Sequence, residues 1–193
     1  MIQSSATPQI VLASASPRRC ELLDQIGVRY IQSVVDIDET YQPGESPEKY
    51  VLRLALAKAH AVRKRDNNQL PVLGADTTVV IDNEALGKPQ DEIHAKAMLK
   101  RLSGVSHQVM TAVALVADQE ASLTSVTLVR FRPLTDNEIS QYWETGEPGD
   151  KAGGYAIQGM GAVFVEHIDG SYSGVMGLPL FETARLLGQF GII

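Results

Sequence analysis

The 193-residue sequence contains one cysteine and no long apolar segment. Because Cys20 stands alone, an intramolecular disulfide cannot form, and one chain cannot supply a cysteine-based zinc site. The N-terminal stretch MIQSSATPQ lacks the basic and apolar regions of an export signal, and no apolar run approaches the length of a membrane span. These absences predict a soluble cytoplasmic protein that does not act at a membrane.

Several nucleotide-binding and catalytic motifs are also absent. The sequence has no GxxxxGK[ST] phosphate loop, no GxGxxG after a strand, no HExxH and no GxSxG. The histidines show no metal-ligand spacing; they are His60, His94, His107 and His167. A nucleotide site in this chain must therefore be of another kind.

The charge balance is acidic, with 17 Lys and Arg against 23 Asp and Glu and a net charge of -6. This balance argues against broad binding to nucleic acid or to an anionic membrane, so any anion-binding surface must be local. The hydrophobic content of 44% is enough for one buried core, and no repeat or linker interrupts the chain. We therefore expect a single domain over residues 1–193.

The order of expected elements alternates between strands and helices. Turn residues, helix caps and apolar periodicity predict strands over 9–13 and 70–81, a β-hairpin of 107–118 and 121–133, a further strand within 161–170, and helices over 17–26, 47–65, 92–102, 136–145 and 177–190. The pair Asp82-Asn83 favours a tight turn after the second strand. The pattern is typical of an α/β fold with a mixed sheet flanked by helices.

The stretch LASASPRR, residues 12–19, lies where the first strand turns into the first helix. A helix N-terminus attracts anions, so a phosphate fits beside Ser14, Ser16 and the turn before Pro17. Arg18 and Arg19 oppose the helix dipole there unless an anion lies between them and the helix end. The alternative, with about equal weight, is that both guanidinium groups extend into water.

Lys58 interrupts the apolar stripe of the helix over 47–65, because it follows Leu54 by four residues on the same face. Such a lysine commonly runs along the edge of the core with its amine in water. The alternative is an amine directed into a cleft toward a phosphate.

Four further segments carry polar residues suited to a site. Asp76 ends a buried strand and could hold a metal or orient a water, although a turn-forming role is commoner there. Lys88 lies in GKP, and Glu39, in the acidic cluster 36–39, could be a second metal carboxylate. Gln158 is in the glycine-rich segment DKAGGYAIQGMG, which either forms a tight connection or closes on a planar ligand.

Taken in order along the chain, these motifs resemble those of the Maf proteins, which are nucleotide pyrophosphatases. The resemblance extends from about Ile10 to the final helix and rests on LASASPRR, Asp38-Glu39, Lys58, GADTTVV, GKP, LSGVSHQVMTAVAL and DKAGGYAIQG. It implies a fold of two lobes around a cleft, similar to inosine triphosphate pyrophosphatase, a divalent cation such as Mg²⁺ or Mn²⁺, a cytoplasmic enzyme and a possible homodimer. Within the family, Arg18, Thr77 and Gln158 resemble the subgroup that acts on dTTP and UTP.

The resemblance also suggests how the residues act on a nucleoside triphosphate. Positive side chains would neutralise the triphosphate, Glu39 and Asp76 would hold the metal, Ser14 would seat a phosphate, and Thr77 and Gln158 would contact the base. Whether Asp76 is the metal ligand or the base stays open. The positive side chains are Arg18, Arg19, Lys58 and Lys88.

Two other functions compete with this interpretation. One is a nucleotide-binding regulator of septum formation that uses the same cleft without catalysis. The other is a pyrophosphatase for methylated GTP. An acid kept beside a set of cations favours the enzyme, because a pure sensor gains nothing from a carboxylate held against a polyphosphate without a metal.

Overall fold

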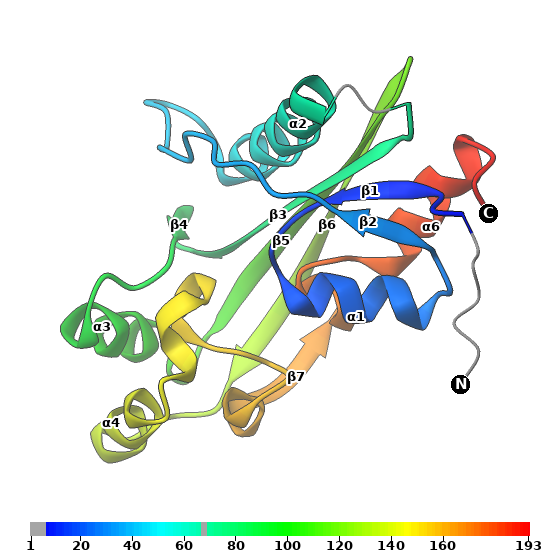
Figure 1. Cartoon of the computed structure of the whole chain (residues 1–193). Coiled ribbons are helices and arrows are strands. Elements are labelled where there is room, and N and C mark those ends of the chain that lie inside the picture. Colours follow the sequence, from blue (N-terminus) through cyan, green and yellow to red (C-terminus); the bar gives the residue numbers. More distant parts are fainter. Residues whose placement is uncertain (1–6, 67–68) are drawn as a thin grey trace.

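The structure, a computed structural model, describes residues 7–66 and 69–193 and contains a 7-stranded mixed sheet. The main strand order is β2-β1-β3-β5-β6-β7, and β4 pairs with β3 (Figure 1). The β1–β2 and β1–β3 pairs are parallel, and the other pairs are antiparallel. The strands are β1 (Ile10–Ala13), β2 (Tyr30–Gln32), β3 (Val72–Ile81), β4 (Glu84–Leu86), β5 (Ser106–Val116), β6 (Glu120–Phe131) and β7 (Val165–Asp169).

Helices cover both faces of the first half of the sheet. The first, second and last are α1 (Pro17–Gln25), α2 (Pro47–Asp66) and α6 (Leu180–Gln189). On β1, Ile10 and Leu12 join the core with α1 and α6, while Val11 and Ala13 pack with α2. Because β1 is buried on both faces, its sequence is a continuous apolar run rather than an alternating one.

The approach of α2 to β3 is close enough to require a glycine. A Cβ atom built on Gly74 would lie 2.1 Å from the backbone oxygen of Ala55 on α2. This contact sets the distance between the helix that carries Lys58 and the strand that carries Asp76. The expectation that Asp76 ends a strand or forms a turn is wrong, because Asp76 lies inside β3 and pairs with Ala112 on β5.

The other half of the sheet carries a separate group of elements. These include α3 (Glu92–Leu102), α4 (Asp136–Glu144), α5 (Tyr172–Met176) and the 3₁₀ helices η1 (Glu147–Asp150), η2 (Ala152–Gly154) and η3 (Met160–Phe164). Their apolar side chains form a second core around Leu99, Phe131 and Ile139. The two halves lie at opposite ends of the sheet, as Figure 1 shows, which confirms the predicted fold class.

Most expected elements are present with small changes at their ends. The long hairpin is β5–β6, and Asp82 and Asn83 form the predicted turn with φ of 53° and 61°. The expected strand within 161–170 is β7, which begins only at Val165 because residues 160–164 form η3. The last helix begins at Leu180 rather than at Gly177, because Gly177 has a φ of 113° and Pro179 is the N-cap.

No helix among the described residues is long and apolar enough to span a membrane. Residues 1–6, which include most of the stretch expected to lack an export signal, lie outside the described residues.

Candidate active site

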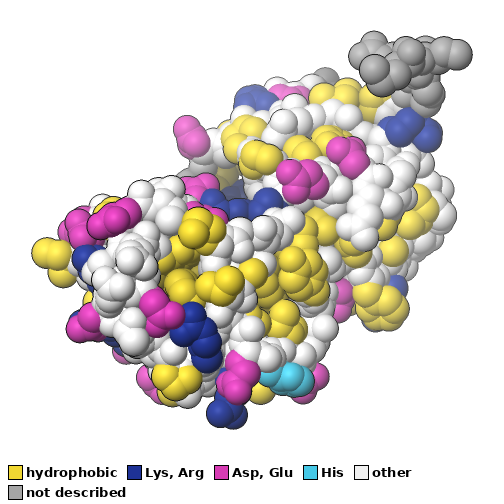
Figure 2. Space-filling view, turned by 90° about the horizontal axis from the view of Figure 1, so that it is seen from below, with side chains coloured by type: hydrophobic (Ala, Val, Ile, Leu, Met, Phe, Trp, Pro, Cys, Tyr) yellow, Lys and Arg dark blue, Asp and Glu magenta, His cyan; other side chains and the backbone are white. Residues whose placement is uncertain are grey.

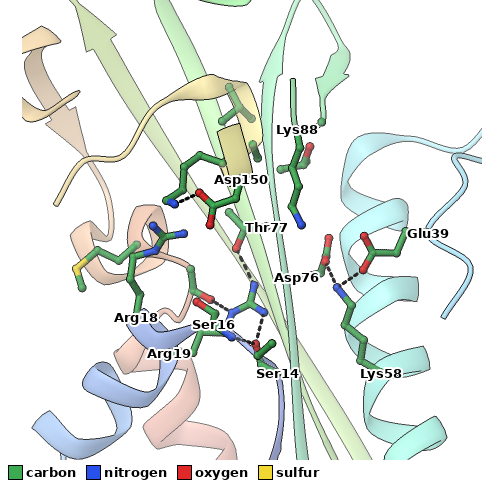
Figure 3. A pocket seen from close by; sticks show the side chains of 18 of the residues that line it. Ser14, Ser16, Arg18, Arg19, Glu39, Lys58, Asp76, Thr77, Lys88 and Asp150 are labelled. Atoms are coloured by element: carbon green, nitrogen blue, oxygen red, sulfur yellow. Dashed lines mark hydrogen bonds and ion pairs between the residues drawn. The ribbon is translucent and has the colours of Figure 1, made fainter. Parts of the chain in front are cut away.

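A cavity of about 1150 Å³ lies between the two halves of the molecule. All nine residues predicted for the site line it: Ser14, Arg18, Arg19, Glu39, Lys58, Asp76, Thr77, Lys88 and Gln158. Figure 2 shows Lys and Arg side chains in the hollow between the two halves, and Figure 3 shows the labelled side chains directed toward one another. Segments far apart in the sequence thus form one polar site.

Lys58 joins two carboxylates at one end of the cavity. Its Nζ lies 2.6 Å from Oδ1 of Asp76 and 2.7 Å from Oε1 of Glu39 (Figure 3). The Lys58 side chain is 16% exposed, and that of Asp76 is 10% exposed. Lys58 therefore points into the cleft, as the second interpretation of its position predicted, but its direct partners are carboxylates.

The two carboxyl groups respond differently to this environment. Burial raises the pKa of Asp76 above its ordinary value, although the charge and hydrogen bond of Lys58 act in the opposite direction. Burial also acts to raise the pKa of Glu39, but the charge and hydrogen bond of Lys58 outweigh it, with Lys88 and Arg19 adding to the lowering. Two neighbouring acids with pKa values pushed apart are suited to different tasks: Asp76 to proton transfer and Glu39 to carrying a charge.

Arg19 is held by neutral oxygens rather than by a carboxylate. Its Nε donates to the Gly177 carbonyl at 2.8 Å, Nη1 to Ser14 Oγ at 3.0 Å and Nη2 to Thr77 Oγ1 at 3.4 Å. Burial lowers the pKa of Arg19, and the charge of Asp76 partly offsets this. An arginine remains charged under these conditions, so Arg19 presents a fixed positive charge to the cavity. Extension into water is therefore wrong for Arg19.

Thr77 supports Arg19 as well as lining the cavity. Its hydroxyl lies 2.9 Å from Thr111 Oγ1, and Thr111 in turn donates to the Gly174 carbonyl at 2.8 Å. Because Thr111 uses its proton on Gly174, Thr77 donates to Thr111 and accepts from Arg19. The contact between Thr77 and a base stays a prediction.

The start of α1 keeps part of its capacity for an anion. Ser16 is the N-cap but makes no side-chain capping bond, and its backbone N–H donates to Ser14 Oγ at 3.2 Å. Ser14 Oγ also accepts from Arg19, which leaves its own proton for a ligand. Arg18 and Lys88 line the same cavity, and neither forms an ion pair within residues 7–66 and 69–193.

The segment between β2 and α2 places Glu39, and sequence patterns did not identify its anchors. Tyr50 Oη donates to the Glu39 carbonyl at 3.0 Å, and Arg53 Nη2 donates to the Thr40 carbonyl at 3.1 Å. Arg53 also binds both carboxylate oxygens of Glu45 at 2.7 and 2.8 Å. These contacts could be found only from the tertiary structure, because a Tyr and an Arg on a helix surface are unremarkable in sequence.

The rim of the cavity beside η1 and η2 adds residues that the sequence reasoning missed. Asp150 and Lys151 line the cavity and form an ion pair with each other. Gln158 lies further along the chain, on the connection to η3, and is exposed. The side chain of Gln158 makes no protein hydrogen bond in the described part of the chain, so its amide is available to a ligand.

Glu39 and Asp76 fit a hard divalent cation. Oxygens of both carboxylates converge on one point, the Nζ of Lys58, within 2.7 Å. No cluster of three or more potential metal ligands occurs among the residues that the structure describes. Two carboxylates completed by substrate phosphates are the ligand set that Mg²⁺ commonly takes.

Comparisons with known proteins identify the family and the fold of the chain. Residues 9–190 match the family described as Maf-like protein. A dTTP/UTP pyrophosphatase from Alkalilimnicola ehrlichii is 57% identical over 99% of this chain and 97% of its own, and one from Pseudoalteromonas translucida is 54% identical over 95% and 98%. Protein VC0702 from Vibrio cholerae shares the fold, with a TM-score of 0.51 and 11% identity over 96% of this chain and 99% of that chain.

Proposed function

The chain belongs to the Maf-like protein family, and from this premise we propose that it hydrolyses dTTP and UTP to the nucleoside monophosphate and pyrophosphate. The observation that carries the proposal is the convergence of four cationic side chains around a buried acid in one cavity. The cations are Arg18, Arg19, Lys58 and Lys88, and the acid is Asp76. The relatives named above, which match nearly the whole chain, support the choice of nucleotides.

The cations prepare the site for a triphosphate. Cleavage between the α and β phosphates moves negative charge onto the departing pyrophosphate, so fixed positive charges lower the barrier. Arg19 is immobilised by Ser14, Thr77 and Gly177 and needs no rearrangement to meet this charge. Arg18 and Lys88 contribute from the facing walls, while the Ser14 hydroxyl donates to a phosphate oxygen at the start of α1.

Asp76 accepts the proton of the attacking water. Its raised pKa makes it a better base than an ordinary aspartate, and Lys58 keeps it ionised by binding Oδ1. Water loses a proton to the carboxylate as its oxygen bonds to the α phosphorus, and the bond to the bridging oxygen breaks. Glu39, with its lowered pKa, remains an anion throughout.

Glu39 and Asp76 would hold a divalent cation, Mg²⁺ or Mn²⁺. When bound, such an ion supplies charge neutralisation of the phosphates and a more acidic water. Lys58 already forms ion pairs with both carboxylates, so these oxygens have a cationic partner when no metal ion is bound.

Gln158 selects the base. Uracil and thymine present donors and acceptors on one edge, and a carboxamide offers both kinds of group. The connection after η2 brings Gln158 to the lining of the cavity, where its residue is exposed.

Location and assembly belong to the same proposal. The free, partly buried Cys20 agrees with a reducing cytoplasm. The resemblance to Maf proteins supports a homodimer, which size-exclusion chromatography with light scattering tests.

The experiment that tests the function measures pyrophosphate release from a panel of nucleoside triphosphates, with and without Mg²⁺ or Mn²⁺. We expect dTTP and UTP to be preferred, and Asp76→Asn to remove nearly all turnover while circular dichroism stays unchanged. Wild-type rates in the variant would exclude Asp76 from the reaction. Binding without release by the native protein would favour a sensor, and a preference for methylated GTP would favour the purine reaction.

A further inference from the structure

The connection that carries Gln158 is held by side chains outside the cavity. Gln158 itself is exposed, yet the residues before it, from Gly153 to Ile157, are buried. An exposed side chain can select a base only if its backbone has a fixed position. What holds this backbone therefore matters for the selection of the base.

Glu147, the first residue of η1, binds the backbone just after Gln158. Its Oε2 accepts from the Met160 N–H at 2.9 Å, and its Oε1 accepts from the Gly161 N–H at 3.0 Å. Burial acts to raise the pKa of Glu147, but the hydrogen bonds from Tyr142, Gly161 and Met160 outweigh it and lower the pKa. The group that binds the two N–H donors is therefore the carboxylate.

Tyr142, on α4, connects this carboxylate to the backbone before Gln158. Its hydroxyl donates to Glu147 Oε1 and accepts from the Ala156 N–H at 3.0 Å. Tyr142 is 3% exposed, so this contact is shielded from water. Backbone groups two residues before and two residues after Gln158 are thus tied to one pair of side chains.

Two glycines make room for the pair. A Cβ atom on Gly159 would lie 2.0 Å from Glu147 Oε2, and one on Gly161 would lie 2.7 Å from Tyr142 Oη. The connection therefore approaches Glu147 and Tyr142 as closely as a backbone without side chains allows.

The other side of the connection is anchored by an aromatic cluster. Tyr155 Oη lies 2.8 Å from Nε2 of the buried His107, and the Tyr155 ring packs against Phe131 with centroids 4.7 Å apart. Tyr155 and Tyr142 hold the segment before Gln158, while Glu147 holds it after Gln158. Gln158 is the exposed side chain between these anchors.

From these contacts we propose that Glu147 and Tyr142 are positioning residues for base selection, acting through Gln158 on the choice of dTTP and UTP over other nucleotides. The inference rests on the proposed function. Neither residue lines the cavity, so neither touches the substrate.

The expected effect of Glu147→Gln depends on the fraction of molecules in which the connection that carries Gln158 keeps its position. A side-chain amide in place of the Glu147 carboxylate cannot accept from both N–H groups with both of its terminal atoms. If the correct position falls to about a tenth of the molecules, the apparent affinity for the preferred bases falls about tenfold. Binding through the phosphates is unaffected, because Arg18, Arg19, Lys58 and Lys88 lie elsewhere in the cavity.

The test is a double-mutant cycle of Glu147→Gln with Gln158→Ala, read as the ratio of kcat/KM for dTTP to that for dCTP. We expect Glu147→Gln to lower this ratio about tenfold in the native background and by less than about twofold in the Gln158→Ala background. Equal effects in both backgrounds would show a merely structural role and would overturn the inference. Tyr142→Phe provides the same cycle if Glu147→Gln does not fold.

Glu138→Gln is the matched control, because Glu138 forms a capping box in the first turn of α4, the helix that carries Tyr142, and does not line the cavity. It accepts from Thr135 N and Oγ1 at 2.8 and 2.9 Å, so its loss lowers thermal stability without changing the ratio. A native protein without pyrophosphatase activity would refute the proposed function. An active protein whose ratio does not respond to Gln158→Ala would refute the inference alone.

Discussion

Replacing Lys58 by Ala tests the centre of the site, because this ammonium is the direct partner of both carboxylates. Its Nζ lies 2.6 Å from Asp76 and 2.7 Å from Glu39. Without it, two acids face each other with no charge between them, and the transition state loses a nearby cation. The usual cost of one such contact predicts a loss of about 10²- to 10³-fold in kcat.

The same substitution should change the pH dependence in a definite direction. Lys58 is the strongest influence that lowers the pKa of Asp76, because an opposite charge and a hydrogen bond at this distance favour the ionised carboxylate. Asp76 must be ionised to accept a proton, so activity falls as the pH falls through its pKa. Losing Lys58 raises that pKa further, so the acidic limb of the pH–rate profile should move to higher pH.

Stability should fall by an intermediate amount. The Lys58 and Asp76 side chains are 16% and 10% exposed, but that of Glu39 is 48% exposed. An exposed ion pair contributes about 0 to 1 kcal/mol to stability, and breaking a buried pair costs about 3 to 5 kcal/mol. We therefore expect Lys58→Ala to lower the free energy of unfolding by about 2 kcal/mol and the Tm by about 4 to 8 °C. Lys96→Ala is the control, since Lys96 pairs with Glu92 on α3 outside the cavity. A Lys58→Ala enzyme within twofold of the native rate, with an unmoved acidic limb, would refute the reasoning.

Two further predictions concern the scaffold. Gly74→Ala should destabilise the fold by about 3 kcal/mol or more in denaturant unfolding, because its Cβ would lie 2.1 Å from the Ala55 carbonyl; Gly188→Ala, with open space around it on α6, should be neutral or slightly stabilising. Burial lowers the pKa of His107 to about 4 in the folded protein. Between pH 6.5 and 4 the unfolded chain therefore binds a proton at His107 and the folded protein does not. The free energy of unfolding should drop by about 3 kcal/mol as the pH falls through that range. His107→Gln should flatten this dependence in thermal melts and the exposed His167→Gln should not; an equal slope in both variants would contradict the assignment.

The features that sequence patterns predicted best are those in which a residue conflicts with its surroundings. Lys58 interrupts an apolar helix face, and Arg19 opposes the dipole at a helix start. Both now have polar partners in the cavity, Asp76 and Glu39 for Lys58 and three neutral oxygens for Arg19. The strands β1 and β3 were equally predictable from sequence, because each is a buried apolar run between clear turn residues.

The start of β7 was not predictable from apolar content alone. Ala162, Val163 and Phe164 are as apolar as a strand, but Phe164 is buried against Tyr142 with ring centroids 4.9 Å apart, and the chain turns in η3 to place it there. Tertiary packing therefore overrides a local β preference at this point.

Glu147 escaped prediction for a related reason. A glutamate next to Gly146 and Pro148 at the start of a loop conflicts with no local rule, so nothing in the pattern sets it apart from a solvated charge. Its partners, the N–H groups of Met160 and Gly161, are 13 and 14 residues away in sequence. A residue proposed to bind a polyphosphate carries a charge where its helix favours an apolar or oppositely charged side chain, and this conflict can be recognised in the sequence. A residue that only holds a backbone in place shows no such conflict. The proposed role of Glu147 and Tyr142 in base preference can therefore be inferred only from the packing of α4 and η1 around the connection that carries Gln158.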